Sequence, residues 1–593
     1  MTVNEKLAHL RLLMKRDSID TYIITKTDPH QSEYTHDYWN QVKYISGFTG
    51  SAGVIVVTKS HAGLWTDGRY YIQAEHELTG TDFKMHKDAE PGVRGFEEYA
   101  GDETPAGGTI GFNGNVISVS QVKKIEGYIK FKHIKLKAGA DLINELRTDR
   151  PLLPKAPVFN HELRFCGVSR LDKLNELRLR MKKKLVDFYV LSSADDIAWL
   201  FNLRGKDIPH ISFFESFAVI DYEKAALFID KDKTPKIRDE LEKENILLYD
   251  INEINGYLDR YNRLPGKPVV LLNPEKTSYN LRQLLKNCEI SECAVDITSS
   301  MKAIKNQTEI DNLEKVNIRD GVAMVRFIIW LKENADKGMN ESDAAEKLLE
   351  FRQAGENFVE PSFPTIAAYM SNAAMMHYSP IKGCCAEIKP EGVLLTDSGG
   401  NYLDGSTDIT RTIVLGKISD KLKRDFTLVL KSHINLADAV FLYGVTGTNI
   451  DTFARMPMWK HCMDYKCGTG HGLGFFLNVH EGPQILTRRI NSVVFEEGMI
   501  ITNEPGVYIE GEYGIRTENT MKVVKYIENE FGIFMRFKTI SYCPVDLSGL
   551  EPDMLTTDER NWLNEYHKTV YAKLSPHLLP REIDWLYENT KEI

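Results

Sequence analysis

Long apolar runs, excess positive charge and clustered cysteines are all missing from this sequence of 593 residues. No run approaches the roughly 20 apolar residues of a membrane span, and the start, Met1-Thr-Val-Asn-Glu-Lys, lacks the apolar core of a signal peptide. Lys and Arg number 74 against 84 Asp and Glu, a net charge of −10. The bulk basic charge used for non-specific binding to nucleic acid or to membranes is therefore absent. We expect a soluble globular protein.

Cysteines are few and scattered along the chain. The eight are Cys166, Cys288, Cys293, Cys384, Cys385, Cys462, Cys467 and Cys543. None lies in a Cys-x-x-Cys pair, which argues against a zinc site built from cysteines. We therefore expect reduced thiols and a cytoplasmic location.

An internal repeat points to two related α/β domains in the first half of the chain. Leu10-Arg-Leu-Leu-Met-Lys returns 167 residues later as Leu177-Arg-Leu-Arg-Met-Lys. In each copy a charged amphipathic helix leads into an apolar strand, which begins near Tyr22 and Tyr189. Single cores stop growing near about 250–300 residues, so several domains are expected in any case. Two unrelated helix–strand units remain the alternative.

The expected boundaries follow a proline-rich stretch and a change of pattern near residue 302. Pro151-Leu-Leu-Pro-Lys-Ala-Pro predicts a linker between the two copies. We place domains at 1–152, 153–301 and 302–593, the last with a C-terminal extension from about 535 to 593. Within the third domain, Thr308, Ser342 and Ser419 are expected to cap helices, the last of which would include Val440 and end at Gly444.

Two aspartates are predicted to lie side by side on a hairpin. An apolar strand ends at Asp397, a glycine-rich turn follows, and a second strand opens at Asp408. Carboxylates held close together repel each other unless a cation, a shared proton or an arginine compensates. Asp and Gly are also ordinary turn residues, so this segment alone leaves a purely structural interpretation open.

Two histidines follow in a segment framed by glycines. His471 stands in Gly468-Thr-Gly-His-Gly, where the backbone can approach a ligand closely. His480 is expected at the end of a short strand over residues 475–479. A histidine in such a loop is a candidate metal ligand or acid–base group.

Two glutamates complete the set. Glu504 ends an apolar strand at a Pro-Gly turn, and Glu518 is expected in the next strand, on one face with Arg516 and Thr520. Arg516 could then brace a carboxylate. The candidate ligands are Asp397, Asp408, His471, Glu504 and Glu518. Such a set suits Mn²⁺, Co²⁺ or Zn²⁺, and its four negative charges match two divalent ions that could activate water and polarise a carbonyl.

With these motifs the sequence resembles the pita-bread metallopeptidases, most closely the long, three-domain Xaa-Pro aminopeptidases. The resemblance rests on Asp397-Ser-Gly-Gly, Asp408-Ile-Thr-Arg-Thr, Gly468-Thr-Gly-His-Gly, Asn478-Val-His-Glu-Gly-Pro, Asn503-Glu-Pro-Gly-Val-Tyr and Ile515-Arg-Thr-Glu-Asn. Outside the candidate site, Ser46-Gly-Phe-Thr-Gly-Ser-Ala-Gly, Trp65-Thr-Asp-Gly-Arg-Tyr and Trp562-Leu-Asn-Glu-Tyr-His look like other parts of the same family. The resemblance therefore covers nearly the whole chain.

The resemblance implies a fold of class α/β (α+β), with two creatinase-like N-terminal domains before a pita-bread catalytic domain. It implies two metal ions, Mn²⁺ first and Zn²⁺ or Co²⁺ as alternatives. The implied ligands are Asp397, Asp408, His471, Glu504 and Glu518, with Asp408 and Glu518 bridging both ions. Glu504 would also accept the proton of a metal-bound water.

Further residues take implied roles around these ligands. His377 would bind substrate near the scissile bond, and His480 would contact the proline side or stabilise the tetrahedral intermediate. Arg516 and Tyr508 match supporting positions behind the ligands. At Cys467 the family usually has a histidine that shapes the substrate pocket, so the resemblance does not carry over to pocket polarity or optimum pH, whereas it does to metal binding. That thiol is either an oxidation-sensitive group or a small apolar filler.

The implied activity removes the N-terminal residue from peptides whose second residue is proline, through attack of a metal-bridging hydroxide on the scissile carbonyl. Implied partners are such peptides and a second copy of the chain in a homodimer, with no nucleic acid and no membrane. One alternative is a prolidase that cleaves only Xaa-Pro dipeptides, against which the doubled N-terminal domain and the C-terminal extension argue. The other is a non-catalytic peptide-binding module, against which the complete ligand set argues.

Overall fold

The computed structural model describes residues 1–593 and divides into two compact units. The first unit comprises residues 1–160, 169–208 and 212–298, and the second comprises residues 161–168, 209–211 and 299–593. None of the helices is long and apolar enough to cross a membrane. The domain boundaries at 152 and 301 stay predictions.

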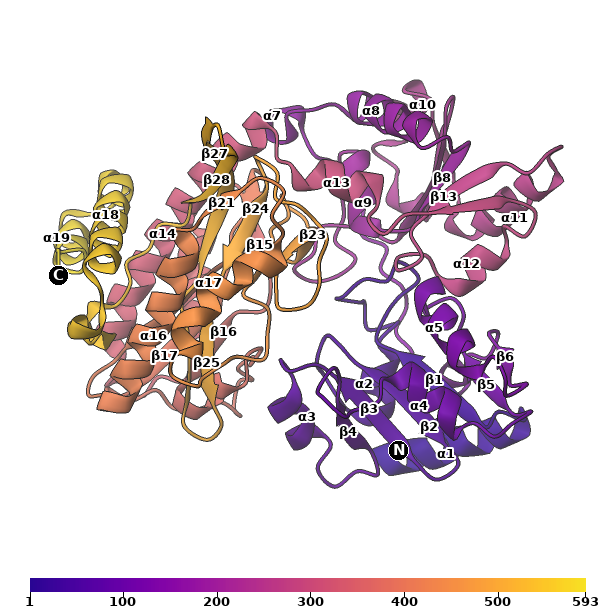
Figure 1. Ribbon diagram of the computed structural model, residues 1–593, viewed down its shortest axis with the longest axis horizontal. Helices are drawn as coiled ribbons and strands as arrows, with labels where there is room; N and C mark the ends of the chain where they lie inside the picture. Colours follow the sequence, from indigo (N-terminus) through magenta and orange to yellow (C-terminus); the bar gives the residue numbers. More distant parts are fainter. The chain divides into compact units, whose positions relative to one another are not determined.

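Two six-stranded sheets make up the first unit (Figure 1). The strands of one sheet are β1 (Thr21–Thr25), β2 (Val54–Thr58), β3 (Ala62–Thr66), β4 (Lys84–Lys87), β5 (Thr109–Phe112) and β6 (Lys135–Lys137). Those of the other are β8 (Phe188–Leu191), β10 (Ser216–Asp221), β11 (Ala225–Ile229), β12 (Ile246–Tyr249), β13 (Val269–Leu272) and β14 (Glu289–Glu292).

The two sheets have the same topology. Their orders are β4-β3-β2-β1-β5-β6 and β12-β11-β10-β8-β13-β14, so corresponding strands take corresponding places. The directions agree as well: β1–β2 and β2–β3 are antiparallel, as are β8–β10 and β10–β11, and the remaining pairs are parallel in both sheets. The predicted repeat is thus confirmed at the level of topology.

The repeat is also present in the buried faces of the leading helices. Helix α1 (Val3–Arg16) begins after the cap Thr2, and α8 (Arg170–Lys183) begins after the cap Ser169. The buried apolar residues of α1 are Leu7, Leu10 and Met14, and those of α8 at the same offset are Leu174, Leu177 and Met181. Apolar residues at helical spacing therefore turn the same face toward the core in both copies.

The second unit contains four sheets and a set of longer helices. A three-stranded sheet has the order β16 (Ile366–Tyr369), β17 (Val393–Ser398), β20 (Ile409–Val414). A six-stranded sheet has the order β21 (Val440–Leu442), β28 (Gly532–Thr539), β27 (Asn519–Asn529), β24 (Ile500–Asn503), β22 (Gly470–Gly472), β23 (Glu481–Leu486). The smaller sheets are β15 (Phe358–Pro361), β18 (Gly400–Tyr402), β19 (Gly405–Ser406) and the pair β25 (Gly506–Ile509), β26 (Tyr513–Arg516).

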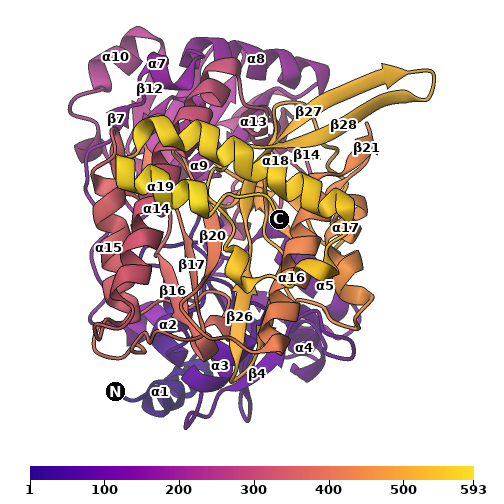
Figure 2. The same cartoon turned by 90° about the vertical axis from the view of Figure 1, so that its left-hand side faces the viewer.

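Six helices account for most of the helical structure of the second unit. They are α14 (Gln307–Asn334), α15 (Glu341–Gln353), α16 (Asp420–Ala437), α17 (Gly447–Trp459), α18 (Thr557–Leu574) and α19 (Pro580–Glu588). The last two belong to the C-terminal extension, and they pack against α14 and α16 (Figure 2).

Of the three predicted helix caps, one is confirmed and two are wrong. Ser419 caps α16 as predicted, and its hydroxyl accepts a hydrogen bond from the backbone N–H of Leu422. The predicted caps Thr308 and Ser342 are wrong, because Asn306 and Asn340 cap α14 and α15. Each asparagine forms a reciprocal capping box with the acidic residue three positions on, which satisfies two backbone donors at once.

The predicted end of the helix after Ser419 is also wrong. Helix α16 ends at Ala437, and Val440 opens strand β21 instead of continuing the helix. Val440 pairs with Arg536 of β28, so pairing with a strand nearly a hundred positions away overrides local helical spacing.

Candidate metal centre

Strands β17 and β20 hold the two aspartates next to each other. The strands are antiparallel, with Asp397 opposite Thr410. Asp408 immediately precedes β20, and both aspartates are buried, with 7% and 3% exposed surface. The predicted hairpin is present, and its turn contains the short pair β18–β19.

His471 points a ring nitrogen at the carboxylates from strand β22. Its Nε2 lies 3.5 Å from Asp408 Oδ2 and 3.4 Å from Glu504 Oε1. The other nitrogen, Nδ1, lies 2.9 Å from the carbonyl oxygen of Gly472. A carbonyl can only accept, so Nδ1 carries a proton and Nε2 is the nitrogen that faces the carboxylates. In the neutral ring this arrangement leaves the Nε2 lone pair for a metal ion.

The two glutamates approach from the ends of neighbouring strands. Glu504 directly follows β24, and its backbone N–H donates to the carbonyl of Thr469 at 2.8 Å. Glu518 lies between β26 and β27, so the expectation that it sits inside a strand is wrong. The strand is interrupted there because the chain leaves the β25–β26 pair for the six-stranded sheet, and the Glu518 N–H donates to the carbonyl of Thr410 at 3.1 Å.

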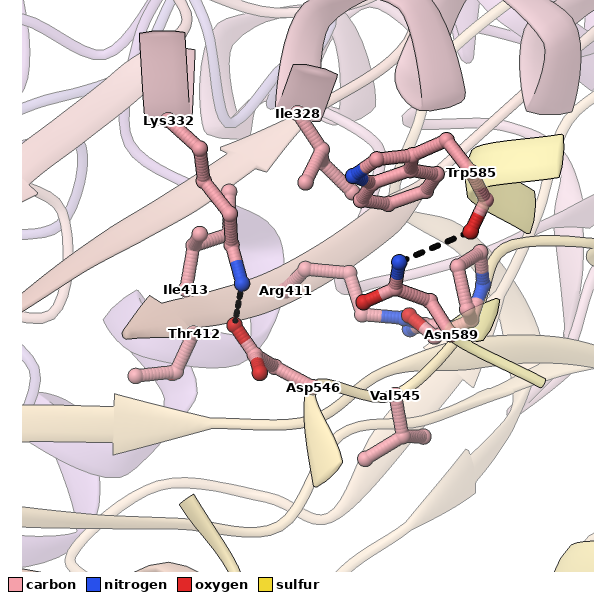
Figure 3. Close-up of a pocket in the computed structure, with 10 residues that line it drawn as sticks. Ile328, Lys332, Arg411, Thr412, Ile413, Val545, Asp546, Trp585 and Asn589 are labelled. Atoms are coloured by element: carbon pink, nitrogen blue, oxygen red, sulfur yellow. Dashed lines mark hydrogen bonds and ion pairs between the residues drawn. The ribbon is translucent and has the colours of Figure 1, made fainter. Parts of the chain in front are cut away.

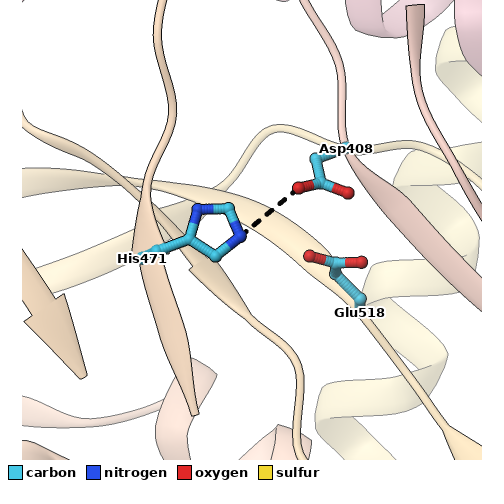
Figure 4. A group of neighbouring side chains, drawn as sticks. All are labelled: Asp408, His471 and Glu518. Atoms are coloured by element: carbon cyan, nitrogen blue, oxygen red, sulfur yellow. Dashed lines mark ion pairs between the residues drawn. The ribbon is translucent and has the colours of Figure 1, made fainter. Parts of the chain in front are cut away.

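Asp408, His471 and Glu518 each offer a ligand atom, and these atoms all lie within 4.8 Å of one another (Figure 4). Burial, and then the Glu518, Asp397 and Glu504 charges, raise the pKa of Asp408 well above its usual range. Burial also raises the pKa of Glu518 strongly and that of Glu504 to about 7. The carboxylates therefore repel one another, and their excess negative charge destabilises the folded site.

The donor set fits divalent cations. Buried carboxylates held close together need compensating positive charge, and the one arginine that contacts them leaves most of their charge unbalanced. Oδ1 of Asp397 is buried and has no hydrogen-bond partner. Four carboxylates and one imidazole are oxygen and nitrogen donors of the kind that Mn²⁺, Co²⁺ and Zn²⁺ accept.

Arg516 braces this cluster from behind. Its Nη2 donates to Asp397 Oδ2 at 2.6 Å, and its Nη1 donates to the Tyr508 hydroxyl at 2.7 Å. Its Nε donates at 3.2 Å to the hydroxyl of Thr410, which in turn donates to Glu518 Oε2 at 2.7 Å. Thr410 thus ties the arginine to a second carboxylate. Thr410 is not among the predicted site residues, although alternation along β20 places it on the same face as Asp408.

The other two predicted histidines lie beside His471. The His480 ring is 4.3 Å from the His471 ring, centroid to centroid, in an edge-to-face arrangement, and the His377 ring is 6.5 Å from that of His480. The expected strand over residues 475–479 is wrong: the segment bends, Phe476 has a φ of 51°, and its N–H donates to the Ser406 hydroxyl. Bonding to β19 instead of to a strand ladder leaves His480 on a loop.

Cys467 lies on the segment between α17 and β22 and is partly exposed. Its carbonyl accepts a hydrogen bond from Arg455 Nη2 at 2.7 Å, and its side chain packs at the edge of the core cluster that also contains Tyr508. The thiol is close enough to raise the pKa of Tyr508, although burial is the larger cause.

The opposite face of β20 carries Arg411, a buried cation held mainly by backbone carbonyls. Its guanidinium donates to the carbonyl of Glu518 at 2.6 Å and to that of Cys543 at 2.7 Å. A cavity beside it is lined by Ile328, Lys332, Val545, Trp585 and Asn589, among others (Figure 3). Arg411 therefore joins the backbone of a candidate ligand to the C-terminal segment, a role that sequence reasoning missed although the residue stands in the quoted Asp408 motif.

Comparison with protein families gives matches along nearly the whole chain. Residues 311–525 match metallopeptidase family M24, and residues 533–593 match the C-terminal region of that family. Residues 6–148 and 149–309 match two models of the creatinase/prolidase N-terminal domain.

Full-length relatives and a solved structure agree with these matches. A probable Xaa-Pro aminopeptidase P of Laccaria bicolor is 37% identical over 99% of this chain and 93% of its own length. Aminopeptidase P2 of Arabidopsis thaliana is 35% identical over 100% of this chain and 89% of its own. The crystal structure of X-prolyl aminopeptidase from Caenorhabditis elegans, described as a cytosolic enzyme with a di-nuclear active site, is 33% identical, with a TM-score of 0.96 and coverage of 100% of both chains.

Proposed function

The chain belongs to metallopeptidase family M24, and from this membership we propose that it is an Xaa-Pro aminopeptidase, which removes the N-terminal residue from peptides with proline in second position. The observation that carries the proposal is the cluster of four carboxylates, three of them buried, beside His471, within a chain that matches such aminopeptidases over its full length.

We infer that Asp397, Asp408, His471, Glu504 and Glu518 hold two divalent metal ions, Mn²⁺ in the first place and Zn²⁺ or Co²⁺ as alternatives. The ligand atoms of Asp408, Glu518 and His471 all lie within 4.8 Å of one another, so these three residues would hold an ion together. The free Oδ1 of Asp397 and the mutual repulsion of the carboxylates support this assignment. When bound, the ions supply Lewis acidity toward the scissile carbonyl and lower the pKa of a water molecule.

Three side chains have separate roles in proton transfer, stabilisation of negative charge and substrate binding. Glu504, whose Oε1 lies 3.4 Å from His471 Nε2, would accept a proton from the attacking water and return it to the proline nitrogen, which must be protonated to leave. His480, beside His471, can donate a hydrogen bond to the oxygen that becomes negatively charged. His377, farther along the same row of rings, is placed to bind substrate near the scissile bond.

The remaining predicted residues shape the site without touching the reacting bond. Arg516 fixes Asp397 and Tyr508 through its two terminal nitrogens. Cys467 stands near Tyr508 and replaces the usual histidine of the family's pocket. We propose that it makes this wall of the substrate pocket less polar.

We also propose a cytoplasmic location and a homodimer. The Caenorhabditis elegans relative is described as cytosolic, which supports the location.

Support for the dimer comes from the hairpin β27–β28, which extends past the helices of its unit (Figure 2). Ile527 pairs with Phe534, and Phe534 pairs with Leu442 of the edge strand β21, so these apolar side chains share one face. Ile527 is 49% and Leu442 43% exposed. Exposed apolar residues in a row on a sheet edge are typical of an interface.

The test of the proposed activity compares two substrates and two variants. With Mn²⁺ added, the chain should release the first residue from Xaa-Pro-Yaa tripeptides, and Glu504→Gln should lower kcat by at least about 100-fold because the proton acceptor is lost. Glu510→Gln, on the exposed turn after β25, is the matched control. Cleavage of Xaa-Pro dipeptides alone would favour the prolidase alternative. Hydrolysis of neither, with no divalent ion bound, would favour the non-catalytic module.

A further inference from the structure

A pair of histidines in the first unit lies outside everything described above. His61 directly precedes β3, and His86 lies on β4, the neighbouring parallel strand at the edge of the first sheet. The Nε2 atoms of the two rings are 3.1 Å apart and share a hydrogen bond, and both side chains are partly exposed. The candidate metal centre belongs to the second unit, so this pair is a separate feature of the chain.

The two nitrogens are spaced as two ligands of one metal ion. Imidazole nitrogens bind Zn²⁺ and similar ions at about 2.0–2.1 Å, and two such bonds ending 3.1 Å apart enclose an angle of about 95–100°. That angle lies between the octahedral and tetrahedral values. The ring centroids are 5.2 Å apart, so the two rings point largely toward each other, and side-chain rotation would bring both lone pairs onto one ion at this spacing.

The surroundings hold the rings in this arrangement. The Trp65 ring stacks on the His86 ring at 3.9 Å with an interplanar angle of 3°, and its own Nε1 donates to the carbonyl of Arg94 at 2.8 Å. The Tyr99 ring lies 5.3 Å from that of His61 and 5.6 Å from that of His86. Gly63 is the second residue of β3, and a Cβ there would come within 2.8 Å of both rings. Its missing side chain leaves room beside the two nitrogens.

The electrostatic setting keeps the rings neutral near pH 7. Burial, and then His61, Arg94 and Lys84, lower the pKa of His86 to about 4. Burial, Lys84 and Arg11 also lower the pKa of His61, against which the charge of Glu103 acts. Each neutral imidazole has one N–H and one lone pair, and the hydrogen bond between the rings places a proton on one Nε2. Metal binding through both Nε2 atoms therefore moves that proton to Nδ1 of the same ring by exchange with water. Glu103, which pairs with Arg94 at 3.2 Å, is the nearby carboxylate that can offset part of the ion's charge.

We propose that His61 and His86 form a second metal site, which binds one borderline transition-metal ion, Cu²⁺ or Zn²⁺, through both Nε2 atoms, with water completing the coordination. Two neutral nitrogen ligands exclude Ca²⁺ and Mg²⁺, which take oxygen ligands. Among divalent ions of this kind, Cu²⁺ binds nitrogen donors most tightly. The Mn²⁺ proposed for the catalytic ions stands at the weak end of the same series, so the two sites differ in preference.

The experiment titrates the full chain, saturated with Mn²⁺, with Cu²⁺ and compares it with the double variant His61→Asn/His86→Asn. We expect the native chain to bind one more equivalent of Cu²⁺ than the double variant, as measured by equilibrium dialysis and metal analysis. Each single variant should weaken that binding at least tenfold. Any Cu²⁺ that enters the catalytic site is the same in all chains, so it cancels in the difference.

Two further variants separate a metal site from a general loss of structure. Gly63→Ala keeps both histidines and places a methyl group beside their rings, so it should also weaken the additional Cu²⁺ binding. His9→Asn, at an exposed position of α1, should not change it. Far-ultraviolet circular dichroism and peptidase activity should be equal in all variants. Equal Cu²⁺ stoichiometry and affinity in the native chain and the double variant would overturn the proposal.

Discussion

Thr410 joins two functional side chains through one hydroxyl group. It accepts a hydrogen bond from Arg516 Nε at 3.2 Å and donates one to Glu518 Oε2 at 2.7 Å. A carboxylate ligand keeps its orientation only if such supporting bonds persist. Because a hydroxyl can accept and donate at the same time, no apolar residue of the same shape can replace it here.

We therefore predict that Thr410→Val lowers kcat/KM for an Xaa-Pro-Yaa peptide about 10–100-fold, with weaker Mn²⁺ binding measured by titration. The control is Thr396→Val on the neighbouring strand β17, where the threonine hydroxyl is buried without a hydrogen-bond partner. That substitution should leave kcat/KM unchanged. Equal effects of the two substitutions would show that the hydroxyl of Thr410 has no special role.

Two buried histidines make the second unit sensitive to acid. Burial and the nearby Arg411 guanidinium lower the pKa of His433 and that of His567 to about 3 each. The Nδ1–H of His433 donates to the carbonyl of Asn503 at 3.1 Å, and its Nε2 accepts from Asn519 Nδ2 at 3.1 Å, so both nitrogens are used in the neutral form. The unfolded chain binds a proton at each histidine below about pH 6.5, and the folded chain does not.

The free energy of unfolding should therefore fall as the pH falls from about 6.5 toward 3. The slope contributed by each histidine is about 1.4 kcal/mol per pH unit, and it is measured by urea denaturation at a series of pH values. His567→Gln should reduce the slope by one such contribution, because the amide oxygen can still accept from the N–H of Val545. His577→Gln, at an exposed site, should leave the slope unchanged. A slope that His567→Gln does not alter would contradict this assignment.

At the scale of single elements, helix α19 contributes to the core through a small number of side chains. Leu586 is fully buried, and Arg326 of α14 pairs with Glu582 at 3.1 Å. Trp585 of the same helix lines the cavity beside Arg411 (Figure 3). The C-terminal extension thus reaches the back of the strand that carries the site.

We predict that Leu586→Ala lowers the free energy of unfolding of the second unit by about 2–5 kcal/mol, because it removes buried methyl groups and leaves a cavity. Leu579, at the start of the same helix, is 61% exposed, and Leu579→Ala should change the stability by less than about 0.5 kcal/mol. Chemical denaturation followed by circular dichroism measures both. A similar cost for the two substitutions would mean that α19 does not pack as described.

At the scale of the whole molecule, the row of exposed and partly exposed apolar residues across β21, β28 and β27 is the proposed dimer interface. Its members are Leu442, Phe534 and Ile527. Leu442→Asp combined with Ile527→Asp should convert the proposed dimer into monomers, because charge cannot be buried there without a partner. Sedimentation at several protein concentrations measures the change. Ile490→Asp is the control, since Ile490 is 98% exposed on a loop outside this row. A native chain that sediments as a monomer at all concentrations would contradict the homodimer.

The sequence by itself determined the features that depend on local chemistry. The 167-residue repeat is confirmed by the common topology of the two sheets, and the resemblance to Xaa-Pro aminopeptidases is confirmed by the relatives. The cap at Ser419 also follows from a short pattern, and the strands predicted to end at Asp397 and Glu504 end one residue away, at Ser398 and Asn503. Caps, turns and alternation involve residues only a few positions apart, so a short window contains their cause.

Only the tertiary structure decided which of these residues meet. Arg516 braces Asp397, 119 positions away, and Thr410 reaches Glu518, 108 positions away. The same kind of distant contact ended α16 early, because Val440 pairs with Arg536, and turned residues 475–479 into a loop, because Phe476 bonds to Ser406. The nearness of His61 to His86 likewise depends on parallel pairing of β3 with β4. Such contacts depend on how separate elements pack, and no local pattern of residues contains that information.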